Sequence, residues 1–193
     1  MTEASGEKET KTYPGTEVTV EWQRKLCIHV GECGRANDAL FIAKRDPWCD
    51  PDEVEVARVA EIVERCPTGA LSYTREDNRQ ESRPLQNTVH VASNGPLYLR
   101  GLLEIQGLTQ APKGLKYRAA LCRCGASKNT PFCDGSHTEA RFEDAGAVGE
   151  SGEALTSTDG PLQVNPMKNG PLVLRGNMCL YSGSGRKAWQ GQQ

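Results

Sequence analysis

The first third of the chain consists of short stretches in which apolar and polar residues repeat at regular spacings. Residues 16–22 (TEVTVEW) alternate with a period of two, which predicts a half-buried strand, and residues 39–43 (ALFIA) suggest a second short strand. Apolar positions then recur at helical spacing over residues 51–66, behind an Asp-Pro start signal. Residues 70–73 (ALSY) indicate a closing strand. This order of elements predicts a small α+β unit over residues 16–75.

The rest of the chain shows β periodicity and an internal repeat. Residues 87–101 (NTVHVASNGPLYLRG) alternate around turn residues, as in a β-hairpin. The run NGPLYLRG at 94–101 returns as NGPLVLRG at 169–176, an offset of 75 residues (169 − 94). We therefore expect residues 161–193 to repeat the β portion of residues 87–142 without metal ligands, and to pack on it.

Three segments lack such patterns and are interpreted as connections. Residues 1–15 are polar and end in Pro-Gly, so we expect them to be disordered. Residues 76–86 form a polar linker, and the Gly-rich residues 143–160 predict a flexible one. The chain is thus expected to hold two modules, residues 16–75 and residues 87–142, followed by the C-terminal repeat.

The composition indicates small modules whose apolar cores alone would not stabilise the folded state. Of the 193 residues, 37% are hydrophobic and 6% aromatic, and eight are cysteines. Small domains with thin cores are often stapled by metals or disulfides. The N-terminus has no apolar signal core and no apolar run reaches the ~18 residues of a membrane span, so we expect a cytoplasmic protein. In a reducing compartment, clustered cysteines bind metal more often than they pair.

Charge and motif content exclude several functional classes. The net charge is −2, with 11 Lys/Arg and 16 Asp/Glu in residues 1–80 and 12 and 9 in residues 81–193. Because neither half has a dense basic tract with interleaved aromatics, we expect no nucleic-acid binding. The chain has no GxGxxG or P-loop motif and no evident Ser/His/Asp set, so we do not expect an enzyme on its own.

Residues 122–137 (CRCGASKNTPFCDGSH) carry the densest group of metal-ligating side chains. Cys122 and Cys124 are followed, after eight residues, by Cys133 and, after three more, by His137. Thiolates and imidazole suit iron–sulfur clusters, zinc or copper. The short Cys-x-Cys spacing suits two thiolates on one iron, with Cys133 and His137 on the other.

This segment resembles the CDGSH iron–sulfur domain of mitoNEET-like proteins, whose pattern is C-x-C-x2-[ST]-x3-P-x-C-D-G-[SAT]-H. Every specified position of the pattern is present. The resemblance covers about residues 87–142 and implies a small β-cap over a 2Fe–2S cluster, with the ligands Cys122, Cys124, Cys133 and His137. The alternative is a zinc knuckle with the same ligands. The nearby Arg123 and Lys128 are interpreted as solvated loop charges.

An imidazole ligand has consequences for the chemistry of such a cluster. A neutral imidazole in place of an anionic thiolate leaves the cluster less negative and easier to reduce. Protons also compete with iron for the imidazole nitrogen. We therefore expect a potential that depends on pH, or release of the cluster in acid.

A second set of ligands lies in the first module, at Cys27, Cys33 and Cys66. The closing run CPTGAL, together with Pro47–Trp48, resembles the divergent mono-cluster ferredoxin family over about residues 16–75. Bacterial ferredoxins use C-x2-C-x2-C, but the middle position here is Val30, which cannot bind iron. Three thiolates suit a 3Fe–4S cluster, and a fourth ligand would allow 4Fe–4S. Cys49 is a candidate for that ligand, whereas His29 is interpreted as a surface residue or a neighbour of the cluster.

Together these features predict an α+β protein with a ferredoxin-like N-terminal domain, a small β-rich CDGSH domain and a C-terminal β repeat. Two clusters predict electron transfer with a redox partner protein. The alternatives are a donor of clusters to an apo-acceptor or a redox or pH sensor, and a zinc-stapled interaction module. Simple CDGSH proteins resemble each other in forming dimers through their caps. Because the ligand-free repeat can take the partner's place, we expect a monomer with an internal pseudo-dimer, the alternative being a homodimer.

Overall fold

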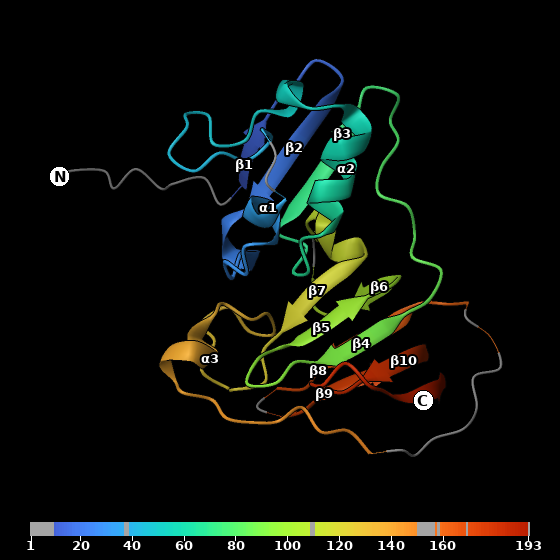
Figure 1. Ribbon diagram of the computed structural model, residues 1–193. Helices are drawn as coiled ribbons and strands as arrows, with labels where there is room; N and C mark the ends of the chain where they lie inside the picture. The colour runs from blue at the N-terminus through green and yellow to red at the C-terminus, as the bar shows by residue number, and fades with distance from the viewer. Residues whose placement is uncertain are drawn as a thin grey trace.

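The computed structural model of the protein, shown in Figure 1, describes residues 10–36, 39–108, 111–149, 157, 159–168 and 170–192. Its N-terminal module is a three-stranded antiparallel sheet of order β1-β2-β3, with one longer helix packed against it. The strands are β1 (Thr10–Tyr13), β2 (Val18–Gln23) and β3 (Leu71–Arg75). The helices are α1 (Glu32–Arg35) and α2 (Val56–Glu64), with 3-10 turns at Arg24–Leu26 and Pro51–Glu53.

The expectation that residues 1–15 are disordered is wrong for residues 10–13, which form β1. This strand pairs with β2 in antiparallel register, Thr10 opposite Gln23 and Tyr13 opposite Val20. Tyr13 is only 3% exposed, and its ring meets Trp48 edge-on at 6.1 Å between centroids. Burial of this one aromatic side chain holds a polar segment onto the sheet edge. Residues 1–9 lie outside the described residues.

Two further elements differ from their sequence-based predictions. Residues 39–43 do not form a strand, because only Phe41 makes a bridge, to Cys49, and Lys44 turns the chain with a φ of 68°. The helix expected over residues 51–66 divides into a 3-10 turn and the shorter α2. Asp50 caps the turn by accepting the Asp52 N–H, and α2 buries one face through Val59, Ile62 and Val63.

The C-terminal two-thirds of the chain form two small sheets. The five-stranded sheet has the order β11-β10-β4-β5-β7, and the three-stranded sheet has the order β6-β8-β9. The strands of the first copy are β4 (Thr88–Val91), β5 (Leu97–Arg100), β6 (Leu103–Ile105) and β7 (Arg118–Leu121). Those of the repeat are β8 (Leu162–Pro166), β9 (Leu172–Arg175), β10 (Asn177–Tyr181) and β11 (Lys187–Gln192). The mixed α+β class expected from the sequence is confirmed.

The two copies of the repeat exchange strands with each other. Each copy forms a hairpin, β4–β5 or β8–β9, and sends its next strand to the hairpin of the other copy. In one direction Glu104 pairs with Gln163, and in the other Cys179 pairs with Thr88. Cys179 lies one repeat offset of 75 residues after Glu104, and Gln163 lies the same offset after Thr88. The two pairings are therefore equivalent, with the two copies interchanged. The chain therefore contains a pseudo-two-fold unit within its described residues.

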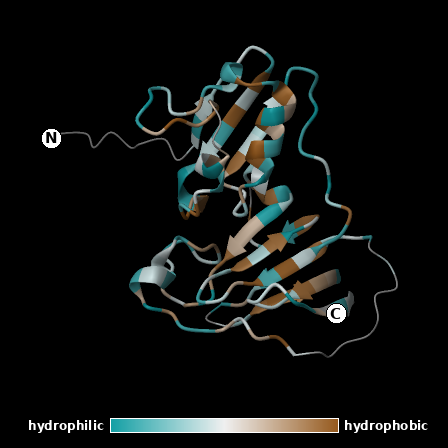
Figure 2. Cartoon of the chain, viewed as in Figure 1, coloured by the Kyte–Doolittle hydropathy of each residue, from teal (hydrophilic) through white to brown (hydrophobic). Residues whose placement is uncertain are grey.

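The N-terminal module stacks on the β-rich part along α2, β3 and β7 (Figure 1). A Cβ on Gly69 would collide with the Arg118 carbonyl, and a Cβ on Gly114 would collide with the Gly69 backbone, so glycine permits this close backbone approach. Buried residues of both modules form one continuous apolar core. The connection from β3 to β4 runs outside it and is largely hydrophilic (Figure 2).

The first residues of the expected 143–160 linker are tied to the fold. The Asp144 carbonyl accepts the Asn94 N–H at 2.7 Å, and the Gly146 carbonyl accepts the Gly183 N–H at 2.8 Å. These contacts connect the segment to turns in both copies of the repeat. Residues 150–156 and 158 of the same segment lie outside the described residues. Among the described residues, no helix has the length and apolar character needed to cross a bilayer.

Candidate iron–sulfur sites

The CDGSH loop begins where β7 ends and folds back across it. The Cys122 N–H donates to Pro131 O and the Cys133 N–H donates to Ala120 O, each at 2.9 Å, so the two cysteines leave one short β-bridge side by side. Gly135 has a φ of 91° and starts α3 (Ser136–Glu139), which carries His137 back toward the cysteines. The backbone thus collects all four side chains that the sequence assigns to a 2Fe–2S cluster.

The four ligands are arranged as two pairs. Cys122 Sγ and Cys124 Sγ are 3.7 Å apart, and Cys133 Sγ and His137 Nδ1 are 3.3 Å apart. Two ligands separated by such distances can share one iron, so the loop offers one pair for each iron of a 2Fe–2S cluster. Within the described residues, no three His, Cys, Asp or Glu side chains gather as they would around one metal ion.

Asp134 holds the loop in this shape from the inside. Its carboxylate accepts the backbone N–H of Lys128 at 2.8 Å and that of Ser136 at 3.0 Å. Although burial works against it, these hydrogen bonds and one from the Ser136 side chain lower the pKa of Asp134 to about 2. Ser127 adds a second brace, since its hydroxyl donates to Phe132 O and accepts the Asn129 N–H.

Arg123 is not the solvated loop charge that the sequence suggested. Its side chain is 14% exposed and forms an ion pair with Asp144 at 2.7 Å. Its Nε also donates to Gly95 O at 2.9 Å, and its other terminal nitrogen donates to Ala92 O at 2.5 Å. Arg123 therefore fastens the ligand loop to the β4–β5 turn. Lys128 is exposed, as expected.

The N-terminal ligands surround a cavity of about 410 Å³. Cys27, Cys33 and Cys66 all line it, although they come from three different segments. Burial raises the pKa of the Cys33 thiol, and the thiols of Cys66 and Cys27 raise it further. The volume of the cavity is within the range of ordinary cofactor sites.

The walls of this cavity fit an iron–sulfur cluster. They are mostly apolar, with Trp22 and Trp48 among the lining residues, although the exposed Lys11 and His29 also line the cavity. Trp22 Nε1 is buried and has no hydrogen-bond partner among the described residues. A buried N–H without a partner is costly. The Thr68 hydroxyl, which also lines the cavity, is 3.4 Å from Cys66 Sγ and accepts the Ala70 N–H.

The two residues considered beyond the three thiols lie in different places. Cys49 is fully buried and is not among the residues that line the cavity. Burial raises the pKa of its thiol to about 12. His29 does line the cavity, and its Nδ1 lies 3.9 Å from Cys27 Sγ.

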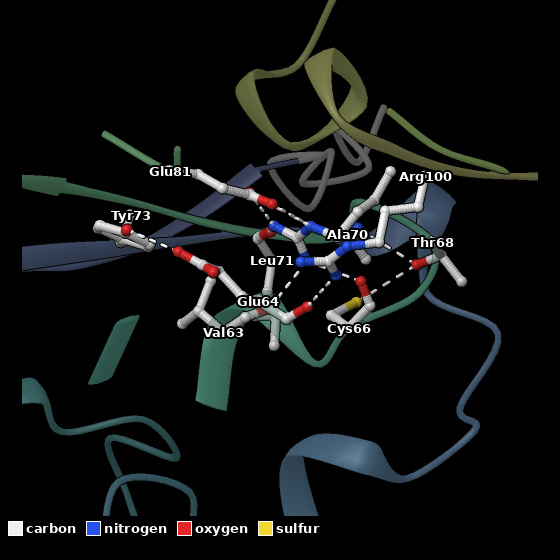
Figure 3. Close-up of polar contacts among 10 residues, drawn as sticks. Val63, Glu64, Cys66, Thr68, Ala70, Leu71, Tyr73, Glu81 and Arg100 are labelled. Carbon is white, nitrogen blue, oxygen red and sulfur yellow. Dashed lines mark hydrogen bonds and ion pairs between the residues drawn. The ribbon is translucent and has the colours of Figure 1, made fainter. Parts of the chain in front are cut away.

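A buried arginine joins the two modules next to the Cys66 loop, and the groups that surround it, Val63, Cys66, Leu71 and Glu81, are labelled in Figure 3. Arg118, on β7, is 1% exposed and uses all five N–H groups. Three of its hydrogen bonds go to carbonyls of the N-terminal module: Val63 O at 2.8 Å, Cys66 O at 2.6 Å and Leu71 O at 3.0 Å. The remaining donors hold the Glu81 carboxylate in a bidentate pair. Through Arg118, the strand that leads into the CDGSH loop is thus hydrogen-bonded to the loop that carries Cys66.

The two ligand loops also touch directly. The Asn129 amide, within the CDGSH loop, donates at 2.8 Å to the carbonyl of Lys25, two residues before Cys27. Burial raises the pKa of Tyr98 on β5, and the Cys133 and Cys66 thiols raise it further. The two candidate cluster sites are therefore neighbours.

Comparison with known proteins gives the same division of the chain. Residues 13–76 match the family described as "Divergent 4Fe-4S mono-cluster", and residues 94–138 match the one described as "Iron-binding zinc finger CDGSH type". In its N-terminal part the chain is 44% identical over 63 residues to the uncharacterized protein YjdI of Escherichia coli (strain K12). That match covers 33% of this chain and 83% of YjdI, and YjdI of Escherichia coli O157:H7 matches with the same figures. No solved structure matches.

The chain therefore belongs to the divergent 4Fe–4S mono-cluster family, and it joins such a domain to a CDGSH iron-binding domain. It is an iron–sulfur protein.

Sequence reasoning missed the residues that couple the sites. Arg118 had a visible signal, because it is a lone charge in the otherwise apolar stretch from Tyr117 to Leu121. Asn129 had none, since an amide in a polar loop is unremarkable. The unpartnered N–H of Trp22 also has no counterpart in the sequence pattern.

Proposed function

We propose that this protein is a one-electron carrier with two clusters. Cys122, Cys124, Cys133 and His137 hold a 2Fe–2S cluster, and Cys27, Cys33 and Cys66 hold a 3Fe–4S or 4Fe–4S cluster beneath a ferredoxin-like sheet. The observation that carries the proposal is the direct contact between the two ligand loops, through Asn129 and Lys25 and through Arg118 and Cys66. When bound, the clusters accept and return single electrons at potentials set by their surroundings.

The protein's own residues supply position and insulation. Arg118 fixes the strand before one ligand loop against the carbonyl of a ligand in the other, so the two sites keep a constant separation. The apolar wall with Trp22 and Trp48 would limit the contact of the first cluster with water on that side. A reductase-type partner would deliver the electron and an acceptor protein would remove it, in the cytoplasm. No chemical transformation of a substrate is assigned to the chain itself.

The pseudo-two-fold unit supports a monomeric carrier. Strand exchange between the two copies already pairs β6 with β8 and β10 with β4 inside one chain. In this proposal the repeat takes the place that a second chain would otherwise take. We therefore propose a monomer rather than a homodimer.

The direct test is the iron and sulfide content of anaerobically purified protein, combined with EPR spectroscopy before and after dithionite reduction. About five or six irons per chain, with a His-ligated 2Fe–2S signal beside a second cluster signature, supports the proposal. About two irons per chain would show that the protein holds one cluster and not two. Zinc without iron would favour the alternative of a zinc-stapled interaction module.

A second candidate function, donation of the 2Fe–2S cluster to an apo-acceptor, is favoured by one observation. Three of the four CDGSH ligands, Cys122, Cys124 and His137, are half-buried rather than enclosed. A cluster at that position is within reach of an acceptor's thiols. Transfer of the cluster to an apo-ferredoxin, followed by absorbance, distinguishes this role from electron transfer alone.

A further inference from the structure

We infer that His29 is the fourth ligand of the N-terminal cluster, so that this site takes a 4Fe–4S cluster bound by three cysteines and one histidine. The inference rests on the proposed function, because it assumes that Cys27, Cys33 and Cys66 hold a cluster. It assigns to His29 the role for which Cys49 is the candidate on sequence grounds.

The cavity itself separates the two candidates. His29 lines it together with the three thiols, whereas Cys49 is not among its lining residues. Cys49 is fully buried behind the wall and forms a backbone bridge with Phe41. Cys49 would have to turn its side chain out of this buried position to reach a cluster, whereas His29 already lines the cavity.

Other cavity residues with polar side chains are weaker candidates. Lys11 and Trp22 carry only N–H donors, and the Thr68 hydroxyl already contacts Cys66 Sγ. Glu32 is paired with Arg35 at 2.8 Å. Burial raises the pKa of Tyr13, so the phenolate that would bind iron is disfavoured.

The backbone at His29 is adjusted to place its ring. His29 has a φ of 55° and Gly31 has a φ of 82°, so the chain turns sharply twice between Cys27 and Cys33. A left-handed conformation is uncommon for a residue with a side chain, and such strain persists where the surroundings require it. The turn brings His29 to the same side of the loop as Cys27, with Nδ1 3.9 Å from Sγ.

The imidazole is chemically suited to this role and available for it. Within the described part of the chain, the Cys27 thiol is the polar partner of the His29 ring. Imidazole nitrogen binds iron and replaces cysteine as a ligand in other clusters, where it raises the potential. Val30, at the position where bacterial ferredoxins carry a cysteine, leaves one iron corner for such a ligand.

The test compares the full chain with variants at positions 29 and 49, after anaerobic reconstitution. His29→Gly and His29→Asn remove the imidazole but tolerate the left-handed backbone, and His29→Cys offers a thiolate in its place. Cys49→Ala is the matched control. Each protein is analysed for iron and sulfide, and for EPR before and after dithionite, with the CDGSH cluster as an internal standard.

The wild type is expected to hold about six irons, with an EPR-silent oxidised N-terminal cluster. His29→Gly and His29→Asn should lose about one iron and show the signal of oxidised 3Fe–4S, while His29→Cys and Cys49→Ala keep the 4Fe–4S cluster. Unchanged iron and EPR in both His29→Gly and His29→Asn, or loss of one iron in Cys49→Ala, would overturn the assignment of His29 as the fourth ligand but would leave the two-cluster proposal standing. A wild type with only the two irons of the CDGSH site would overturn both this assignment and the two-cluster proposal.

Discussion

Replacing Arg118 with methionine should destabilise the protein strongly, because Arg118 is the main polar contact between the modules. The change removes a buried cation and leaves the carbonyls of Val63, Cys66 and Leu71 without their donors. It also leaves Glu81, whose side chain is 9% exposed, without its partner. Breaking one side of a buried ion pair costs about 3–5 kcal/mol, so we expect the free energy of unfolding to fall by about that amount.

Urea unfolding of the cluster-loaded wild type and variant, followed by far-UV circular dichroism, measures this loss. The matched control is the double variant Arg118→Met/Glu81→Met, which removes both charges. It should recover part of the loss, because replacing both partners by apolar groups avoids an unpaired buried charge. A loss below about 1 kcal/mol in Arg118→Met, or no recovery in the double variant, would refute the role given to this pair.

The loss should also depend on pH. Burial raises the pKa of Glu81 above its usual value, and Arg118 opposes that shift. In Arg118→Met the opposition is gone, so the pKa of Glu81 in the folded state should rise further. A carboxyl with a raised pKa contributes stability that is complete below its unfolded pKa and lost as pH rises through the folded value. The difference in the free energy of unfolding between the wild type and Arg118→Met should therefore become smaller as the pH falls from about 7 to about 5.

The remaining predictions concern the sites and the assembly. Asp134→Ala removes the acceptor for the Lys128 and Ser136 N–H groups, so the 2Fe–2S absorbance should decay several-fold faster than in wild type; an unchanged decay rate would count against the bracing role. Light scattering of the intact protein should give the mass of one chain, and a stable dimer would contradict the internal pseudo-dimer.

Much of the fold was predictable where the sequence repeats or alternates. The repeated NGPL runs predicted a second β copy, and the CDGSH pattern predicted which residues gather in the second loop. Strand β1 was not predicted, because its stability comes from the burial of Tyr13 against Trp48 rather than from any pattern in a polar segment. The helical spacing was visible, but it could not show that Val54 and Glu55 interrupt the helix.

The candidate sites were predictable at the level of ligand types and not at the level of their surroundings. Cysteine spacing predicted that Cys27, Cys33 and Cys66 belong to one site, and it favoured Cys49 over His29 as the fourth ligand. The proposal that His29 takes this role instead depends on which side chain lines the cavity and on a left-handed turn that no sequence pattern reveals. The link between the sites likewise depends on Arg118 and Asn129, which lie far in sequence from the loops they hold.

The central claim is that two clusters lie close enough in one chain to exchange an electron, and EPR of the fully reduced protein tests it most directly. The reference spectra come from two single-cluster variants, Cys27→Ala/Cys33→Ala and Cys122→Ala/Cys124→Ala. The contact between the ligand loops predicts that two reduced, paramagnetic clusters interact, so the spectrum of the intact protein should be split or broadened relative to the sum of the references. A spectrum equal to that sum would contradict the account.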